Sequence, residues 1–293
     1  MTNSDTDAAS QLPRIPGSLP YPTFLDAFLR PLKPCIITGL ADNWPAFNEW
    51  TRRNPLTSDL VPDYDALRAA FGKFTGCITF CDEYDDANGS APQRELSVAQ
   101  FIDDMTTQSP QKRYLKDFHF MRVNPQLPPP YTVPNFFQGI HLSQKNMLIG
   151  DDWYNRVAVE TESDDFRFLY LGEDGSFTQL HHDVCMSHSW STSLCGTTTS
   201  RLQWWELSYV GIKEWTLIAP EDAHYLKNPM TDALPSTLDS QHEQFPFLKN
   251  AREKAIVVRQ YPGETIFVPS GWYHQVQNHG SSPSPDPLNP SAG

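Results

Sequence analysis

The chain contains few basic residues for its size, and this shortage limits the partners that it can have. Of its 293 residues, 22 are Lys or Arg and 35 are Asp or Glu, which gives a net charge of −13 at pH 7. A surface with this balance repels phosphate backbones, so we expect no nucleic-acid substrate. The sequence also lacks an apolar run of about 18 residues, the minimum for a membrane-spanning helix, so we expect no membrane partner.

Cysteine is scarce as well, and its spacing does not suggest a disulfide framework. The polar segment 1–10 is not typical of a signal peptide, so we expect reduced thiols and a cytoplasmic or nuclear location. The segment Cys77-x-x-x-Cys81 has the spacing of half a zinc site, but no second Cys/His pair matches it. The cysteines are Cys35, Cys77, Cys81, Cys185 and Cys195.

What the sequence does contain favours a β-rich domain. Aromatic residues make up 12% of the chain, and there are 26 prolines. Short apolar or alternating runs separated by turn residues predict several strands in the second half, which is typical of a sandwich or barrel. The predicted strands are 166–171, 177–184, 189–195, 213–219, 255–259, 265–268 and 273–277.

The same patterns divide the chain into four parts. We expect a polar, disordered leader over 1–15 and an α/β region over 16–160 that buttresses the barrel. The barrel core follows over 161–278 with an insertion at 197–211, and a Ser/Pro-rich disordered tail ends the chain at 279–293. Within the second part, Ser97-x-x-Gln100 predicts a capped helix, and 35–39, 77–81 and 114–120 predict strands.

The segment His181-His182-Asp183 is the first candidate for a chemical site. Residues two apart on a strand share a face, so His181 and Asp183 can point to one centre. An imidazole and a carboxylate are two of the three ligands in the facial triad that holds non-haem Fe(II). The alternative is a solvated pair at the end of a strand.

A third ligand candidate lies in the second half of the chain, at His274. The sequence GETIFVPSGWYH over 263–274 predicts a strand, a tight Pro-Ser-Gly turn and a second strand that begins near His274. In a barrel, such a strand can bring a distant histidine to the same interior as His181 and Asp183. The alternative is a core imidazole that bonds to the backbone.

Several motifs together resemble the JmjC-domain 2-oxoglutarate oxygenases. The segments 114–120 and 187–191 most resemble the JmjC-domain protein 4 subgroup. The resemblance covers about residues 20–278. It implies a double-stranded β-helix, also called a cupin or jelly-roll barrel, with flanking helices. The motifs are Thr178-x-x-His181-x-Asp183, Gly211-x-Lys213-x-Trp215, and Val268-Pro269-x-Gly271-Trp272-x-His274.

The resemblance also implies a role for each matching residue. His181, Asp183 and His274 correspond to the iron ligands, and the implied cofactors are Fe(II), 2-oxoglutarate and O2. The implied reaction is hydroxylation of a protein, and the subgroup is associated with lysyl hydroxylation of the translation release factor. The alternatives are a scaffold without turnover, a histone demethylase, and a cupin-type metal isomerase or hydrolase.

Four further residues match co-substrate positions by the same resemblance. Lys213 corresponds to the cation that pairs with the far carboxylate of 2-oxoglutarate, and a dianion in a closed barrel needs such a partner. Thr178 and Tyr114 correspond to hydroxyl donors to that carboxylate. Ser191 lies where some relatives carry Asn near the co-substrate. The alternatives are a surface lysine for Lys213 and ordinary strand packing for Thr178 and Tyr114.

Two segments depart from the family pattern. Residues 197–211 separate Gly196 from Lys213, either as a hairpin insertion or as translated intron sequence, because Gly196-Thr197 and Val210-Gly211 can be encoded with splice borders. After Asn278, prolines replace a strand that closes the barrel in relatives. We therefore expect an open edge on the strand that carries His274, and a form of the chain that is poorly stable and weakly active or inactive.

Overall fold

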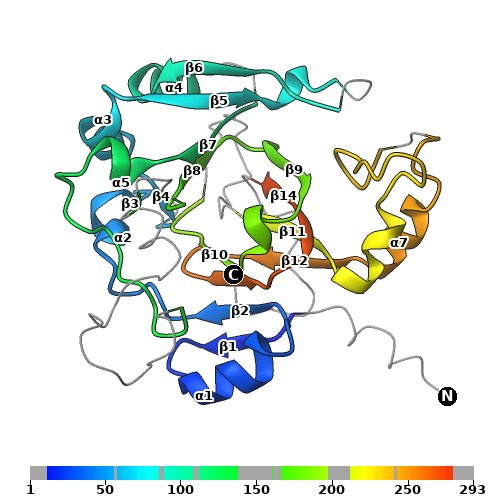
Figure 1. The fold of residues 1–293 in the computed structure, drawn as a ribbon. Coiled ribbons are helices and arrows are strands. Elements are labelled where there is room, and N and C mark those ends of the chain that lie inside the picture. Colours follow the sequence, from blue (N-terminus) through cyan, green and yellow to red (C-terminus); the bar gives the residue numbers. More distant parts are fainter. Residues whose placement is uncertain are drawn as a thin grey trace.

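The computed structural model describes residues 12–55, 58–85, 89–107, 112–137, 161, 166–196, 212–240 and 243–279. Within these ranges the strands form three four-stranded sheets and one two-stranded ribbon (Figure 1). No helix in this part of the chain is long and apolar enough to cross a bilayer. The expected insertion at 197–211 and residues 280–293 of the expected tail lie outside the described residues.

The strands are 3 to 7 residues long. The α-helices are 4 to 9 residues long, which is short for helices of a globular protein. The strands are β1 (Arg14–Pro16), β2 (Cys35–Thr38), β3 (Thr51–Arg53), β4 (Leu60–Pro62), β5 (Thr75–Phe80), β6 (Gln93–Ser97), β7 (Arg113–Phe118), β8 (Leu169–Gly172), β9 (Phe177–His181), β10 (Ser189–Thr192), β11 (Ile212–Ile218), β12 (Ile256–Gln260), β13 (Thr265–Val268) and β14 (Tyr273–His279). The α-helices are α1 (Tyr21–Phe24), α2 (Pro45–Glu49), α3 (Tyr64–Phe71), α4 (Val98–Thr106), α5 (Phe120–Val123) and α7 (Leu248–Lys254). A π-helical turn η1 (Leu25–Leu29) follows α1, and the 3₁₀ turns are η2 (Cys81–Glu83), η3 (Val184–Met186) and η4 (Pro220–Tyr225).

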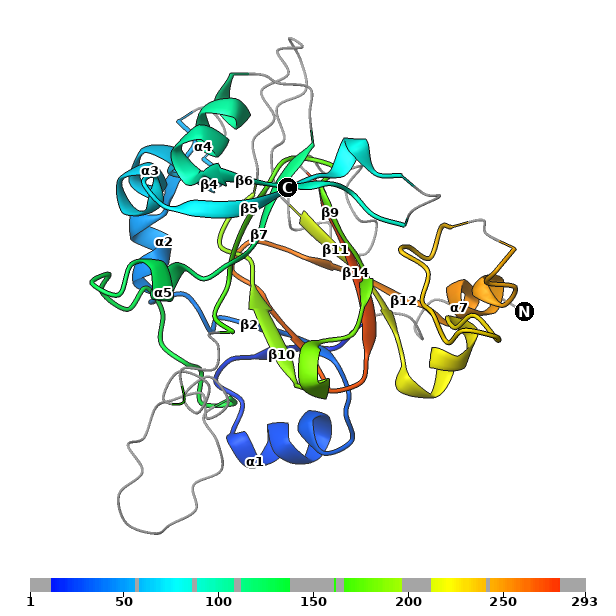
Figure 2. The same ribbon diagram turned by 45° about the horizontal axis from the view of Figure 1, so that its top comes forward.

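Two of the four-stranded sheets face each other and enclose the interior. One has the order β1-β2-β13-β10 and the other β12-β11-β14-β9; in Figure 2, β10 and β14 lie on opposite sides of the interior. Buried residues of both sheets form one core cluster, which includes Ile36 and Ile266 from the first and Leu217, Val258 and Val276 from the second. The predicted mainly-β fold with flanking helices is confirmed, although the ladders between described residues do not close a barrel.

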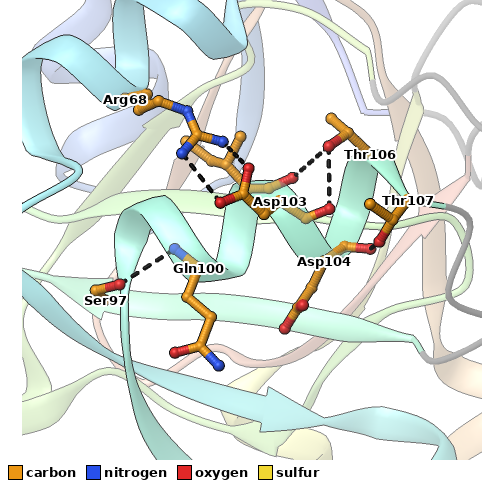
Figure 3. Close-up of polar contacts among 8 residues, drawn as sticks. Arg68, Ser97, Gln100, Asp103, Asp104, Thr106 and Thr107 are labelled. Carbon is orange, nitrogen blue, oxygen red and sulfur yellow. Dashed lines mark hydrogen bonds and ion pairs between the residues drawn. The ribbon is translucent and has the colours of Figure 1, made fainter.

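The third sheet, in the order β6-β5-β7-β8, carries helices α3 and α4 on one face. Ser97 caps α4 by accepting a hydrogen bond from the backbone N–H of Gln100 at 3.1 Å, as the sequence predicts. The Arg68 guanidinium of α3 bonds both carboxylate oxygens of Asp103 in α4 (Figure 3). This exposed ion pair joins the two helices, while their apolar side chains pack on the sheet. The last strand of the sheet, β8, leads directly to β9.

Helical turns cover the outer faces of both facing sheets. On the first sheet, Phe24 of α1 packs against Phe267 of β13 with ring centroids 5.3 Å apart. On the second, Leu180 of β9 and Ile218 of β11 pack with Leu248 of α7. Each interior face of these sheets is therefore backed by apolar packing, which fixes the strands that carry the site.

The structure corrects the expected boundaries at both ends. Within the supposed leader, Leu12 is buried and Arg14–Pro16 form β1, which pairs with β2. The strand forms there because the apolar side chains of Leu12 and Ile15 are buried against the rest of the fold. Strand β2 belongs to the same sheet as β13, so the barrel core is not limited to 161–278. The supposed tail begins too early, since His279 is the last residue of β14 and pairs with Ile212.

The expectation of an open edge beside His274 is wrong. Strand β14 lies between β11 and β9 and pairs with both of them. Its backbone groups are therefore bonded on either side, and the argument that this edge destabilises the chain does not hold. Among the described strands of these two sheets, the edges are β1, β10, β12 and β9 instead.

Candidate metal centre and co-substrate site

Three residues from two neighbouring strands meet at one end of the interior. His181 ends β9, Asp183 follows two residues later, and His274 is the second residue of β14, directly opposite His181. The two imidazole rings have their centroids 4.3 Å apart. One ligand atom from each of the three residues lies within 4.8 Å of the others, a spacing that suits a single metal ion.

A β-bulge in β9 explains how Thr178 and His181 share the interior face although they are three residues apart. Thr178 lies opposite Val276 and His181 opposite His274. Between these two pairs β9 advances three residues, whereas β14 advances two. The extra residue lets both Gln179 and Leu180 turn outward. Leu180 packs against the outer helices and Gln179 donates a side-chain hydrogen bond to the carbonyl of Gly89.

Both histidines present the same ring nitrogen to the centre. The Nδ1 atom of His181 lies 2.8 Å from the carbonyl oxygen of Gln179, and that of His274 lies 3.3 Å from the carbonyl oxygen of Trp272. A carbonyl only accepts, so Nδ1 carries the proton and Nε2 keeps its lone pair in each ring. Backbone contacts of this kind fix the tautomer of metal-binding histidines.

The protonation state of His274 also suits a metal ligand. Its side chain is 3% exposed. Burial, together with the neighbouring His181, lowers the pKa of His274 to about 4. The imidazole is therefore neutral at physiological pH, which is the form that binds a metal. Two neutral imidazoles and one carboxylate make the donor set of a non-haem Fe(II) site.

Lys213 lies on the same interior face, further along the sheet. On β11 it shares a face with Trp215 and Leu217, which belong to the core between the two sheets. Leu217 pairs with His274, whereas Lys213 pairs with Asn278, so four residues separate the two rows. At about 3.3 Å per residue the metal end and the lysine end are roughly 13 Å apart along the strand.

Aromatic and polar groups surround the lysine end. The Lys213 ammonium lies 5.6 Å from the centre of the Tyr170 ring, and the Tyr114 ring lies 6.1 Å from that of Tyr170. Burial raises the pKa of the Cys195 thiol to about 12, against the opposing effect of the nearby Lys213. The structure thus places Lys213 and Tyr114 around one aromatic ring, and Lys213 is not a surface lysine.

Thr178 and Ser191 occupy interior positions between these two ends. Thr178 pairs with Val276, and Ser191 pairs with Ile266; both partners belong to the core between the sheets. The backbone carbonyl of Ser191 accepts a hydrogen bond of 2.7 Å from the side chain of Gln260. Thr178, Ser191 and Lys213 therefore line the same interior as the three metal-ligand candidates, while Tyr114, on β7 of the third sheet, is connected to Lys213 through the Tyr170 ring.

Sequence reasoning missed Tyr170, whose position is set by a strained neighbour. Its hydroxyl donates to Oδ1 of Asp117 at 2.7 Å, and Asp117 has a φ of 52° at an irregular point of the β7–β8 ladder. Desolvation of the phenol and the Asp117 carboxylate raise the pKa of Tyr170, although 36% of the residue's surface is exposed, so the phenol stays protonated. The only available signal was its alternation with Phe168 along the strand.

Gln260 and Asn278 were missed as well, because their importance depends on tertiary contacts. Gln260 is fully buried, accepts from the indole N–H of Trp215 at 2.9 Å and donates to two carbonyls. Asn278 is 7% exposed and donates to the Ser176 hydroxyl at 3.0 Å. Both pair with Lys213 across the ladders, so they fix the strand that carries it.

Comparison with known proteins agrees with this geometry. The sequence profile of the cupin-like domain matches residues 21–289, and the chain therefore belongs to the cupin-like domain family. Within that family, the relatives confirm the resemblance to JmjC-domain oxygenases and to the JmjC-domain protein 4 subgroup.

Three relatives illustrate the match. A Gallus gallus protein named 2-oxoglutarate and iron-dependent oxygenase JMJD4 is 30% identical over 89% of this chain and 56% of its own length. An Arabidopsis thaliana protein named arginine-specific demethylase JMJ20 is 30% identical over 92% of this chain and 54% of its own. The JmjC domain-containing protein 1 of Schizosaccharomyces pombe is 28% identical over 92% and 68%. The chain thus spans little more than half the length of the first two.

Proposed function

We propose that this chain is an Fe(II)- and 2-oxoglutarate-dependent oxygenase that hydroxylates a protein. The observation that carries the proposal is the meeting of His181, Asp183 and His274 within 4.8 Å, on the interior that also holds Lys213. A bound iron ion would use O2 and 2-oxoglutarate to convert a C–H bond of the substrate to C–OH; one oxygen atom of O2 enters the hydroxyl group and the other enters succinate, and CO2 is released. A metal isomerase or hydrolase has no need of a lysine at the far end.

Each candidate site residue has a defined role in this proposal. His181, Asp183 and His274 hold the iron, and three protein ligands leave positions open for co-substrate and oxygen. Lys213 pairs with the far carboxylate of 2-oxoglutarate, since a cation on an apolar wall binds a carboxylate strongly.

Hydroxyl groups complete the co-substrate end. Thr178 and Tyr114 donate to the same carboxylate, and Ser191 borders the co-substrate from β10. The interior positions of Thr178 and Ser191, and the contact of the Tyr114 ring with the Tyr170 ring beside Lys213, support this assignment.

For the substrate, we propose a lysyl side chain of a translation release factor. The support is the similarity to the relatives named JMJD4 oxygenases, together with the net charge of −13, which favours the approach of a cationic segment. The relative named an arginine-specific demethylase favours a second candidate, removal of an N-methyl group. The same oxidant performs both reactions, because hydroxylation of an N-methyl group releases it as formaldehyde.

One experiment separates these functions. The purified chain is incubated with Fe(II), 2-oxoglutarate and release-factor peptides that carry lysine or methylarginine, and succinate and peptide mass are measured. Hydroxylation predicts iron-dependent succinate and a lysine peptide heavier by one oxygen atom. Formaldehyde with loss of a methyl group indicates demethylation instead. Metal binding without succinate from any peptide would favour a non-catalytic scaffold, and Asp183→Ala provides the inactive control.

A further inference from the structure

The carboxylate of Asp183 has a partner that neither its sequence motif nor the proposed reaction requires. The hydroxyl of Ser189, the first residue of β10, donates to Oδ2 of Asp183 at 2.7 Å. Ser189 pairs with the core residue Val268, which places its side chain on the interior face of the first sheet. The bond therefore connects β10, in one of the facing sheets, to Asp183, which lies two residues after β9 of the other sheet.

This hydrogen bond sets the rotation of the carboxylate. With Oδ2 held by Ser189, the carboxylate cannot turn freely, and one of its oxygens lies within 4.8 Å of a ligand nitrogen of His181 and of His274. Groups that hydrogen-bond to metal ligands in this way orient them and commonly change metal affinity by 10–100-fold when removed. Asp183 lies beyond the end of β9, so no ladder fixes its side chain, and the Ser189 bond supplies that constraint.

The turn between Asp183 and Ser189 is strained. Cys185 and Met186 have φ values of 55° and 54°, a left-handed conformation that non-glycine residues adopt only when their surroundings enforce it. Val184 and Met186 are more than half exposed, so packing of their side chains does not hold the turn.

Ser270 supplies the missing constraint. Its hydroxyl donates to the carbonyl of Met186, and its backbone N–H donates to Nδ1 of His188 at 3.0 Å. Ser270 lies in the turn that leads into β14, four residues before His274. The turn that carries Asp183 is therefore bonded to the turn that carries the distant histidine.

We propose that Ser189 and Ser270 are positioning residues of the metal centre. Ser189 fixes the orientation of the Asp183 carboxylate, and Ser270 fixes the strained turn against the strand that bears His274. The inference rests on the proposed function for the presence of a metal, but it concerns how the ligands are held rather than the reaction.

Metal binding to the metal-free protein tests the proposal without measuring turnover. Co(II) is titrated into the wild type, Ser189→Ala, Ser189→Thr and Ser270→Ala, and affinity is measured by calorimetry and ligand geometry by visible absorption. Ser187→Ala is the matched control, since Ser187 lies in the same turn and its hydroxyl makes no hydrogen bond to the residues that the structure describes. Melting temperatures of the metal-free proteins show whether a variant folds.

We expect Ser189→Ala to bind Co(II) about 10–100-fold more weakly, with an altered absorption spectrum and a nearly unchanged melting temperature. Ser189→Thr keeps the hydroxyl and restores affinity, while Ser187→Ala matches the wild type. Ser270→Ala, at a half-buried surface position, weakens binding about tenfold or less. Should Ser189→Ala fail to fold, retained affinity in Ser189→Thr and loss in Ser270→Ala decide the question.

Two results would overturn the proposal in distinguishable ways. Wild-type affinity and an unchanged spectrum in folded Ser189→Ala and Ser270→Ala would show that neither serine positions the ligands, and would leave the proposed function intact. A wild type that binds no Co(II) would refute the metal centre itself, and with it the proposed function.

Discussion

Removing the Lys213 ammonium tests the co-substrate end of the site directly. Lys213→Ala deletes an ammonium group that lies 5.6 Å from the centre of the Tyr170 ring, on a residue whose ladder partner in β14 is Asn278. The metal end lies roughly 13 Å away along the strand, at about 3.3 Å per residue. We therefore expect weaker 2-oxoglutarate binding and unchanged metal affinity.

The size of the effect follows from the interaction that is lost. A hydrogen bond between a charged donor and a carboxylate contributes about 1.5–3 kcal/mol. Each 1.4 kcal/mol changes an equilibrium constant about tenfold, so the dissociation constant of 2-oxoglutarate should rise by roughly 10–150-fold. The Lys213 ammonium is partly buried beside the Tyr170 ring, and partial exclusion of water strengthens such a bond.

The assay is a calorimetric titration of 2-oxoglutarate into protein saturated with Mn(II), which avoids turnover. Lys249→Ala is the matched control, since it removes the same charge from an exposed position of α7. Equal 2-oxoglutarate affinity in Lys213→Ala and the control would refute the assigned role. Loss of Mn(II) binding in Lys213→Ala would show instead that the two ends of the site are not independent.

Three further predictions concern stability, each measured by urea unfolding of the metal-free protein. His274 has a pKa of about 4 in the folded chain against 6.5 normally, so its contribution is complete above pH 6.5 and is lost toward pH 4; the loss should amount to about 3 kcal/mol. The same pH dependence in His274→Gln would contradict this. Burial raises the pKa of Glu173 to about 7 from 4.5, so its ionisation opposes folding as the pH rises from 4.5 through 7. Glu173→Gln should therefore stabilise the chain at pH 8 by about 1–2 kcal/mol, allowing for partial solvent screening, with no gain at pH 4; an equal effect at both pH values would refute the cause. In Gly172→Ala the new Cβ would lie 2.5 Å from Oγ of Ser176 and 2.6 Å from Cδ2 of Tyr114, so we expect a loss of about 1–3 kcal/mol. An unchanged unfolding midpoint would show that Tyr114 moves aside freely.

Local patterns predicted the elements well wherever packing does not interrupt them. The run 265–268 is β13, and the Ser97 cap begins α4 as expected. The predicted strand over 114–120 ends instead at Phe118, because Asp117 has a left-handed backbone and Phe120 begins α5. A regular alternation in sequence does not reveal such an interruption, since it depends on the contact of Asp117 with Tyr170.

The candidate site shows the same division between local and tertiary information. The spacing of His181 and Asp183 was sufficient to suggest a shared centre. The position of His274 opposite His181 depends on strand order, which the sequence does not encode locally. Strict alternation would place Thr178 and His181 on opposite faces, so only the resemblance, and then the bulge, accounts for that pair.

The bulge in β9 means that the metal end and the co-substrate end have separate registers. Thr178 lies before the extra residue and pairs with Val276. His181 lies after it and pairs with His274. Deleting either Gln179 or Leu180 would leave two steps between Thr178 and His181, so a regular alternating strand would keep both side chains on the interior face and both pairings with β14. Flattening the bulge with the sequence unchanged would instead place Thr178 and His181 on opposite faces, so the bulge is what lets the metal end and the co-substrate end share one interior.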